Sequence, residues 1–120
     1  MNVEQSTICD TLDTYPHLIF DATGKAEDMR ETWQLLEAKK DCEEATAFLT
    51  AKATTEKITE TTAKNKATVA VYDRAMECVK AESSYRRALA DQKRLENEFD
   101  AVKKKANIVT ANIQRLGAAA

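Results

Sequence analysis

The chain has 120 residues, of which 43% are hydrophobic and 32% charged, and its net charge is −2. This length allows one domain at most, and so many charges with only two Gly and one Pro are typical of an elongated helical or coiled-coil protein. The three cysteines lie more than thirty residues apart, which argues against a disulfide framework and against a zinc site. We expect a cytoplasmic location, the host cytoplasm if the protein is viral, because we find neither a signal peptide nor a long apolar run.

The first 24 residues mix β-branched and aromatic side chains with Pro16, and Leu18, Ile19 and Phe20 form an apolar cluster. Thr7 with Asp10 can cap a short helix, and Gly24 is a signal for a helix end. We therefore predict a short N-terminal arm over residues 1–24, a helical hairpin over residues 25–117 and a tail over residues 118–120.

From Lys25 to Leu116 the chain runs for 92 residues without Pro or Gly. A first long helix is predicted over residues 25–53, because apolar residues return there with the alternating three- and four-residue spacing of a coiled coil. The residues with this spacing, which we expect to form its buried face, are Leu35, Ala38, Cys42, Ala45 and Leu49, and the stripe is widened by Met29, Trp33, Leu36 and Phe48.

A Thr-rich stretch follows Phe48, and β-branching and hydroxyl competition weaken a helix there. We place the reversal in a hinge over residues 54–59, with Thr55 as a helix cap and Glu56 in the first turn of the next helix. The second helix is predicted over residues 59–116, ending at Gly117. Its buried seam, with Arg74 and Gln92 as polar exceptions, is Val71, Cys78, Ala81, Tyr85, Ala88, Gln92, Leu95, Phe99, Val102, Ala106, Val109, Ile113 and Leu116.

The two predicted helices differ in length: at 1.5 Å per residue they are about 43 Å and about 85 Å long, so about 25 residues of the second lack a partner. That overhang carries the strongest part of the heptad repeat, namely Leu95, Phe99, Val102, Val109, Ile113 and Leu116. Either the N-terminal arm or another subunit must cover it. We predict a homo-oligomer with these six residues in its interface.

The charges are divided unevenly, because residues 1–50 hold eleven acids and four bases, whereas residues 51–120 hold fourteen bases and nine acids. One interpretation is a solvated helix face, as the acids Glu96, Glu98 and Asp100 among the bases suggest. The other is a basic stripe that follows a phosphate backbone and is repeated by oligomerisation. The residues predicted to contact nucleic acid are Lys52, Lys57, Lys64, Lys66, Arg86 and Arg87.

Catalytic motifs are not found in the sequence, which has no Gly-rich phosphate loop and no nucleophile elbow. His17 stands alone beside Pro16, without the second ligand that a metal site would need. Trp33 could stack on a base, but an anchoring role in a core or interface is the favoured interpretation. We therefore expect no enzyme, no cofactor and no metal ion.

The hinge segment Lys52-Ala53-Thr54-Thr55-Glu56-Lys57-Ile58-Thr59, then Tyr72, an Ala-rich seam and residues 95–102, resembles the UvsY-type recombination mediators of tailed phages. The resemblance covers residues 12–110. It implies a small helical protein that forms rings, binds single-stranded DNA and helps to load a recombinase onto strands covered by single-strand-binding protein. In that family the first helix ends in a Lys-Ala-Arg segment implicated in DNA contact. Here Thr54 replaces the Arg, and Lys52, Lys57, Lys64 and Lys66 could supply the lost charge.

The sequence thus predicts an all-α, coiled-coil-like antiparallel hairpin that binds single-stranded DNA as a homo-oligomer, without a membrane, in phage-type recombination or replication. The alternative is a non-enzymatic interaction protein, either an adaptor or a phage inhibitor of a host complex, that does not bind nucleic acid. Such a protein would use the acidic half of the chain, where Asp10, Asp13, Asp21, Glu27, Asp28 and Glu31 could mimic nucleic acid.

Overall fold

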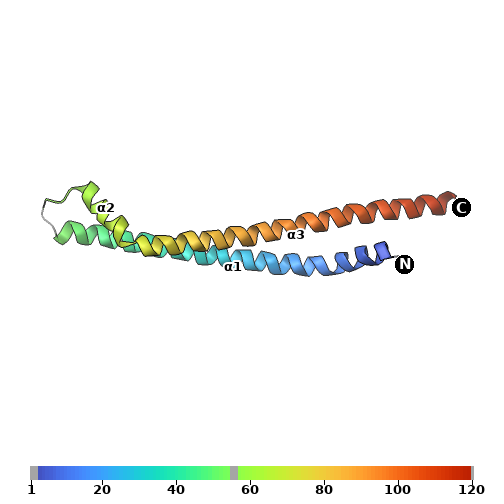
Figure 1. Cartoon of the computed structure of the whole chain (residues 1–120), viewed down its shortest axis with the longest axis horizontal. Helices are drawn as coiled ribbons and strands as arrows, with labels where there is room; N and C mark the ends of the chain where they lie inside the picture. Colours follow the sequence, from blue (N-terminus) through green and yellow to red (C-terminus); the bar gives the residue numbers. More distant parts are fainter. Residues whose placement is uncertain (1–2, 55–56, 120) are drawn as a thin grey trace. The chain divides into compact units, whose positions relative to one another are not determined.

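The computed structural model describes residues 3–54 and 57–119, with side-chain environments for residues up to 117. It has three helices in this part of the chain: α1 (Val3–Thr54), α2 (Glu60–Ala70) and α3 (Tyr72–Ala119) (Figure 1). The predicted all-α class is therefore confirmed. The chain divides into two compact units, a terminal unit (Met1–Ala26 with Ala88–Ala120) and a hinge unit (Glu27–Arg87).

In the terminal unit the first half of α1 pairs with the second half of α3 in antiparallel orientation. The Tyr15 hydroxyl donates a hydrogen bond of 2.8 Å to Glu98 Oε2, and Lys105 Nζ lies 3.2 Å from Glu4 Oε1. The rings of Tyr15 and Phe99 stack with their centroids 6.4 Å apart. Residue 4 pairs with residue 105, and residue 15 pairs with residues 98 and 99. The two helices of this unit therefore run in opposite directions.

In the hinge unit the second half of α1 and the first half of α3 are also antiparallel, and α2 precedes α3 in the chain. The rings of Trp33 and Tyr85 stack with centroids 5.8 Å apart, and Arg74 Nη2 lies 3.0 Å from Glu43 Oε1. Ala63 and Ala67 of α2 are completely buried or nearly so. Small side chains thus let α2 approach its neighbour closely, and little apolar area is buried per residue.

The heptad seam predicted for the second helix is observed on α3. Val71, Cys78 and Ala88 are buried, and the seam residues from Ala81 to Val109 are half-buried or better, including Gln92. Because one apolar stripe dominates this helix, its sequence period identifies the inner face without ambiguity. Ile113 and Leu116 continue the spacing but are exposed.

The predicted boundary between an N-terminal arm and a helix at residues 24 and 25 is wrong, because α1 is continuous from Val3. Pro16 lies inside α1, where it cannot donate to the carbonyl of Leu12, but its ring is on the exposed side. At Gly24 the backbone has no positive φ. Packing of Ile8, Tyr15 and Ile19 against α3 therefore outweighs two local helix-breaking signals.

The buried face predicted for the first long helix is also wrong. All five residues chosen for it are exposed, with Leu35 at 58% and Leu49 at 65%. The residues that were expected only to widen the stripe, Met29, Trp33, Leu36 and Phe48, are the half-buried ones. Two apolar stripes run along this part of α1, and the inner one contains Lys40 and Glu44, which hide its period.

The second predicted helix is divided at Val71, whose φ and ψ of −104° and 14° are not helical. The β-branched residues Thr68, Val69 and Val71 weaken the helix at this point, and burial of Val71 favours the local change in direction. The predicted stop at Gly117 is not observed, since α3 continues to Ala119. Of the predicted hinge residues, Thr55 and Glu56 lie outside the described residues.

Candidate nucleic-acid interface

Two described residues before α2, Lys57 and Thr59, have distinctive local structure. Lys57 has a φ of 67°, a left-handed conformation that costs a non-glycine residue about 1 kcal/mol. Thr59 caps α2, because its Oγ1 accepts a hydrogen bond of 3.2 Å from the backbone N–H of Thr62. This threonine, rather than Thr55, therefore supplies the observed cap of the returning helix.

The four lysines predicted at this end of the hairpin, Lys52, Lys57, Lys64 and Lys66 (the hinge lysines), are all exposed. Lys52 Nζ lies 5.9 Å from the centroid of the Phe48 ring. Lys64 and Lys66 are two residues apart, so they lie about 160° apart around α2. The structure therefore places these two lysines on opposite flanks of α2 rather than side by side.

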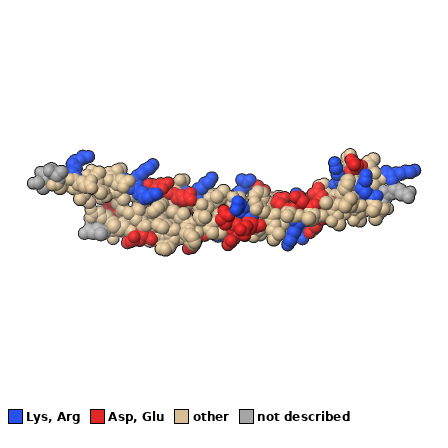
Figure 2. All heavy atoms as spheres, turned by 180° about the vertical axis from the view of Figure 1, so that it is seen from behind, with Lys and Arg blue, Asp and Glu red and all other residues tan. Residues whose placement is uncertain are grey.

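None of the hinge lysines forms an ion pair within residues 3–54 and 57–119. Figure 2 shows Lys and Arg side chains with little Asp or Glu around α2 and the end of α1. Between residues 51 and 72 the sequence has four lysines and two acids, Glu56 and Glu60. The hinge is thus a locally cationic surface of an acidic chain.

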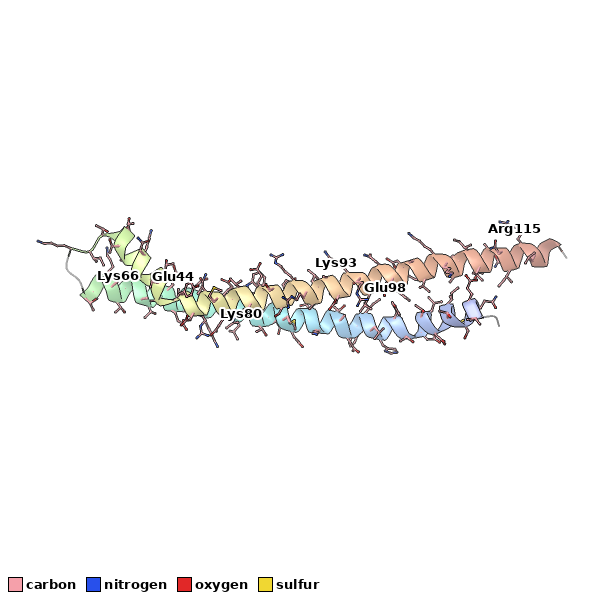
Figure 3. All side chains as sticks on the ribbon, viewed as in Figure 1. Glu44, Lys66, Lys80, Lys93, Glu98 and Arg115 are labelled. Atoms are coloured by element: carbon pink, nitrogen blue, oxygen red, sulfur yellow. The ribbon has the colours of Figure 1, made fainter. Side chains whose placement is uncertain are left out.

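A groove of about 660 Å³ opens between α1 and α2 beside these lysines. Phe48, Leu49 and Ala67 form its apolar part, and Asp41, Glu44 and Lys64 contribute the charges. Glu44 and Lys66 are labelled on α1 and α2 in Figure 3. Two carboxylates in this groove disfavour a phosphate near Lys64, which leaves the opposite flank of α2 as the better site for an anion.

The two predicted arginines differ in their surroundings. Arg86 Nη2 lies 2.6 Å from Glu82 Oε1, one turn away on α3, whereas Arg87 is exposed without an ion pair in the described residues. Arg74 is held by Glu43 and by Glu77, and their hydrogen bonds raise its pKa. Among the α3 cations of the hinge unit, Lys80 and Arg87 therefore have no ion pair with a described residue.

The residues predicted for an oligomer interface mostly have partners within the chain. Leu95, Phe99, Val102 and Val109 are half-buried in the terminal unit, and only Ile113 and Leu116 are largely exposed. The premise that this segment lacks an intrachain partner is wrong, because α1 begins at Val3. Of the apolar cluster proposed to cover it, Ile19 lies against α3, whereas Leu18 and Phe20 are exposed.

Tyr15 and Glu98, which join α1 to α3 in the terminal unit, were not singled out for this contact from the sequence, whereas an anchoring role was favoured for Trp33. The hydrogen bond from Tyr15 lowers the pKa of the Glu98 carboxyl group, with Arg94 acting in the same direction, and that bond raises the pKa of Tyr15. In Figure 3 Glu98 points towards α1 and Lys93 points away. Trp33 is half-buried, and its Nε1 donates to Glu37 Oε1 at 3.3 Å, so it acts as an anchor rather than as a base-stacking platform.

Within residues 3–54 and 57–119, no group of three or more His, Cys, Asp and Glu side chains is placed to hold a metal ion. The same part of the chain contains no helix with the length and apolar character needed to cross a membrane. Comparison with protein-family models, with curated proteins and with solved structures finds no match. The resemblance to recombination mediators therefore depends on the hinge sequence and the helical pattern alone.

Proposed function

We propose that this protein is an accessory factor of phage-type recombination or replication that binds single-stranded DNA through its hinge lysines and assists recombinase loading as a homo-oligomer. The observation that supports it is the group of four exposed lysines at one end of the hinge unit, none of them neutralised by an ion pair in the described residues. Exposed ammonium groups that are free of carboxylates can exchange their counterions for phosphates, which is the main source of sequence-independent affinity.

The geometry favours a weak contact for each subunit. Lys64 and Lys66 diverge around α2, so one subunit offers about two or three phosphate contacts and binds in the range of about tens of micromolar to millimolar. Linked subunits would raise the effective concentration and increase avidity about a hundredfold or more. Binding should depend little on base sequence, and it should favour single strands, which bend to reach separated lysines.

The test is fluorescence anisotropy with a labelled single strand over a series of salt concentrations. The double substitution Lys64→Glu with Lys66→Glu should weaken binding at least tenfold and lower the slope of log affinity against log salt by at least about 0.7, the contribution of one phosphate contact. Most of this loss is expected from Lys66, because Asp41 and Glu44 lie in the same groove as Lys64. The matched control, Lys39→Glu with Lys80→Glu, makes the same change in net charge at two exposed lysines away from the hinge.

A control that weakens binding as strongly as the hinge substitution would show that net charge, rather than the hinge, determines affinity. Unchanged binding in the hinge variant would move the site to α3, where the candidates are Arg86, Arg87, Lys93 and Arg94. Helicity and mass should be equal in all variants, because every substituted lysine is exposed.

The second candidate, an interaction protein that does not bind nucleic acid, is favoured by the exposed apolar residues Leu35 and Leu49 of α1. If the unmodified protein fails to bind the strand at low salt, this candidate is the better one. Neutralising Glu27, Asp28 and Glu31 should then abolish partner binding, while loss of the hinge lysines should have no effect.

A further inference from the structure

The exposed face of α1 in the hinge unit carries a second heptad stripe, here called the outer stripe. At 100° per residue it lies on the side of α1 opposite Trp33, Leu36 and Lys40, which form the inner face. All of its members are exposed, and its two leucines are at 58% and 65%. In chain order the outer stripe is Glu31, Leu35, Ala38, Cys42, Ala45, Leu49 and Lys52.

The order of residue types along the outer stripe is the same in both directions, except that one end is acidic and the other basic. Leucines flank two alanines, the alanines flank Cys42, and the ends are an acid and a base. A two-fold axis near Cys42 therefore places Leu35 against Leu49 of a second copy and Glu31 against Lys52. A parallel pairing in register would instead bring Glu31 against Glu31 and Lys52 against Lys52.

We propose that the outer stripe binds a second copy of this chain in antiparallel orientation, with the two-fold axis at Cys42. The alternating three- and four-residue spacing is the one that lets a helix pair along its length, and alanines at the centre allow close approach of the two backbones. Complementary end charges select the orientation and the register. Asp41 lies beside the axis in each copy, so the two Asp41 carboxylates repel each other. Lys40 Nζ, 3.8 Å from Asp41 Oδ1 of the same copy, reduces this repulsion.

The size of the contact sets its strength. The stripe spans 22 residues, or about 32 Å of helix. Its small central residues bury little area, so the interface is below the standard size. We therefore expect a weak dimer, with a dissociation constant on the order of micromolar or above. At the ends, Leu35 of the second copy lies near Ala45 and Leu49, which also line the groove between α1 and α2. Such a contact extends the buried area beyond the stripe itself.

The dimer does not require nucleic acid, so its tests are made without DNA and their failure leaves the phosphate-binding proposal intact. In the dimer, Lys52 contacts the second copy, whereas Lys57, Lys64 and Lys66 lie outside the stripe. Phosphate binding at the hinge should therefore persist in the dimer with a smaller contribution from Lys52.

The first test uses Cys42 as a probe of the axis. A variant that keeps only Cys42, with Cys9→Ser and Cys78→Ala, should form a disulfide-linked dimer rapidly under copper–phenanthroline oxidation, because a disulfide needs Cα atoms within about 7 Å. The matched control keeps only Cys9, which is also exposed. We expect cross-linking at Cys42 to be at least tenfold faster, and equal rates in the two variants would overturn the proposal.

The second test reverses the end charges and follows the dimer by sedimentation velocity. Glu31→Lys or Lys52→Glu alone should weaken the dimer about tenfold, whereas the double reversal should restore it to within about threefold. Both residues are exposed, so helicity should not change. Lys80→Glu on α3 is the control and should leave the dimer constant unaltered. A double variant that is as weak as the single ones, or weaker, would contradict the antiparallel pairing.

Discussion

The terminal unit and the hinge unit are both antiparallel helix pairs, but they are stabilised differently. In the terminal unit larger aliphatic and aromatic side chains pack between the two helices: Ile8 is buried, and Phe99 stacks on Tyr15. A hydrogen bond also joins Tyr15 to Glu98. In the hinge unit the buried residues are mainly small, as in α2, and one large aromatic stack of Trp33 and Tyr85 stands out. The hinge unit therefore depends strongly on one contact.

The substitution expected to have the largest effect is Trp33→Ala. It removes the stack with Tyr85 and a large half-buried side chain, which should lower the free energy of unfolding by about 2–3 kcal/mol. Urea denaturation followed by circular dichroism at 222 nm measures this quantity. Phe99→Ala, the corresponding change in the terminal unit, should have a smaller effect because its ring is smaller.

Leu35→Ala is the matched control for Trp33→Ala, because the sequence pattern predicts Leu35 on the buried face of α1, whereas the structure exposes it. In the isolated monomer it should change the free energy of unfolding by less than about 0.5 kcal/mol. A larger loss for Leu35→Ala than for Trp33→Ala would mean that the predicted stripe, not the observed one, is the inner face of α1.

This pair of residues shows why the sequence predicts one helix better than the other. On α3 a single stripe from Cys78 to Val109 alternates with charged residues, so periodicity alone identifies the buried positions. On α1 two apolar stripes compete, and the inner one is interrupted by Lys40 and Glu44. Periodicity then favours the cleaner outer stripe, and only packing against α2 and α3 decides between them.

The hinge lysines show a similar limit for the candidate site. Their closeness in sequence correctly predicts that they occupy one end of the hairpin, because the reversal falls at the end of α1. Their directions depend on where α2 begins and which of its residues are buried. Ala63 and Ala67 form that buried face, so Lys64 and Lys66 are directed to opposite flanks, which composition could not indicate.

Gly24→Ala tests the continuity of α1 across the predicted boundary. A Cβ atom at this position would meet nothing within 4 Å, and the residue has no positive φ, so alanine should stabilise the helix by about 1 kcal/mol. Thermal unfolding should therefore occur at a higher temperature. Gly117→Ala, equally open but in the last turns of α3, is the control and should have a smaller effect. Destabilisation by Gly24→Ala would instead support a helix end at this residue.

The smallest expected effect, and the one most specific to the terminal unit, is the dependence of its stability on the charge of Glu98. The hydrogen bond from Tyr15 and the ion pair with Arg94 hold the pKa of this carboxyl group below its ordinary value of 4.5. A lowered folded-state pKa means that the carboxylate contributes stability above its ordinary pKa and loses that contribution as the pH falls through the folded-state value. Glu98→Gln should therefore lower the unfolding temperature near pH 7, and the difference from the unmodified protein should shrink on acidification below about pH 4.5.

Tyr15→Phe provides the partner for a double-mutant cycle. It should cause a similar loss near pH 7, and combining it with Glu98→Gln should cost less than the sum of the two losses, because both substitutions act on the same hydrogen bond of 2.8 Å. Phenylalanine lacks the donor, and the neutral amide oxygen of glutamine is a weaker acceptor than the carboxylate. At the alkaline end the raised pKa of Tyr15 has the opposite consequence: its contribution is complete below the ordinary value of 10.0 and is lost as the pH rises through the folded-state value. Additive losses, or a Glu98→Gln difference that is constant from pH 7 to pH 3, would show that the contact between α1 and α3 does not stabilise the terminal unit in solution.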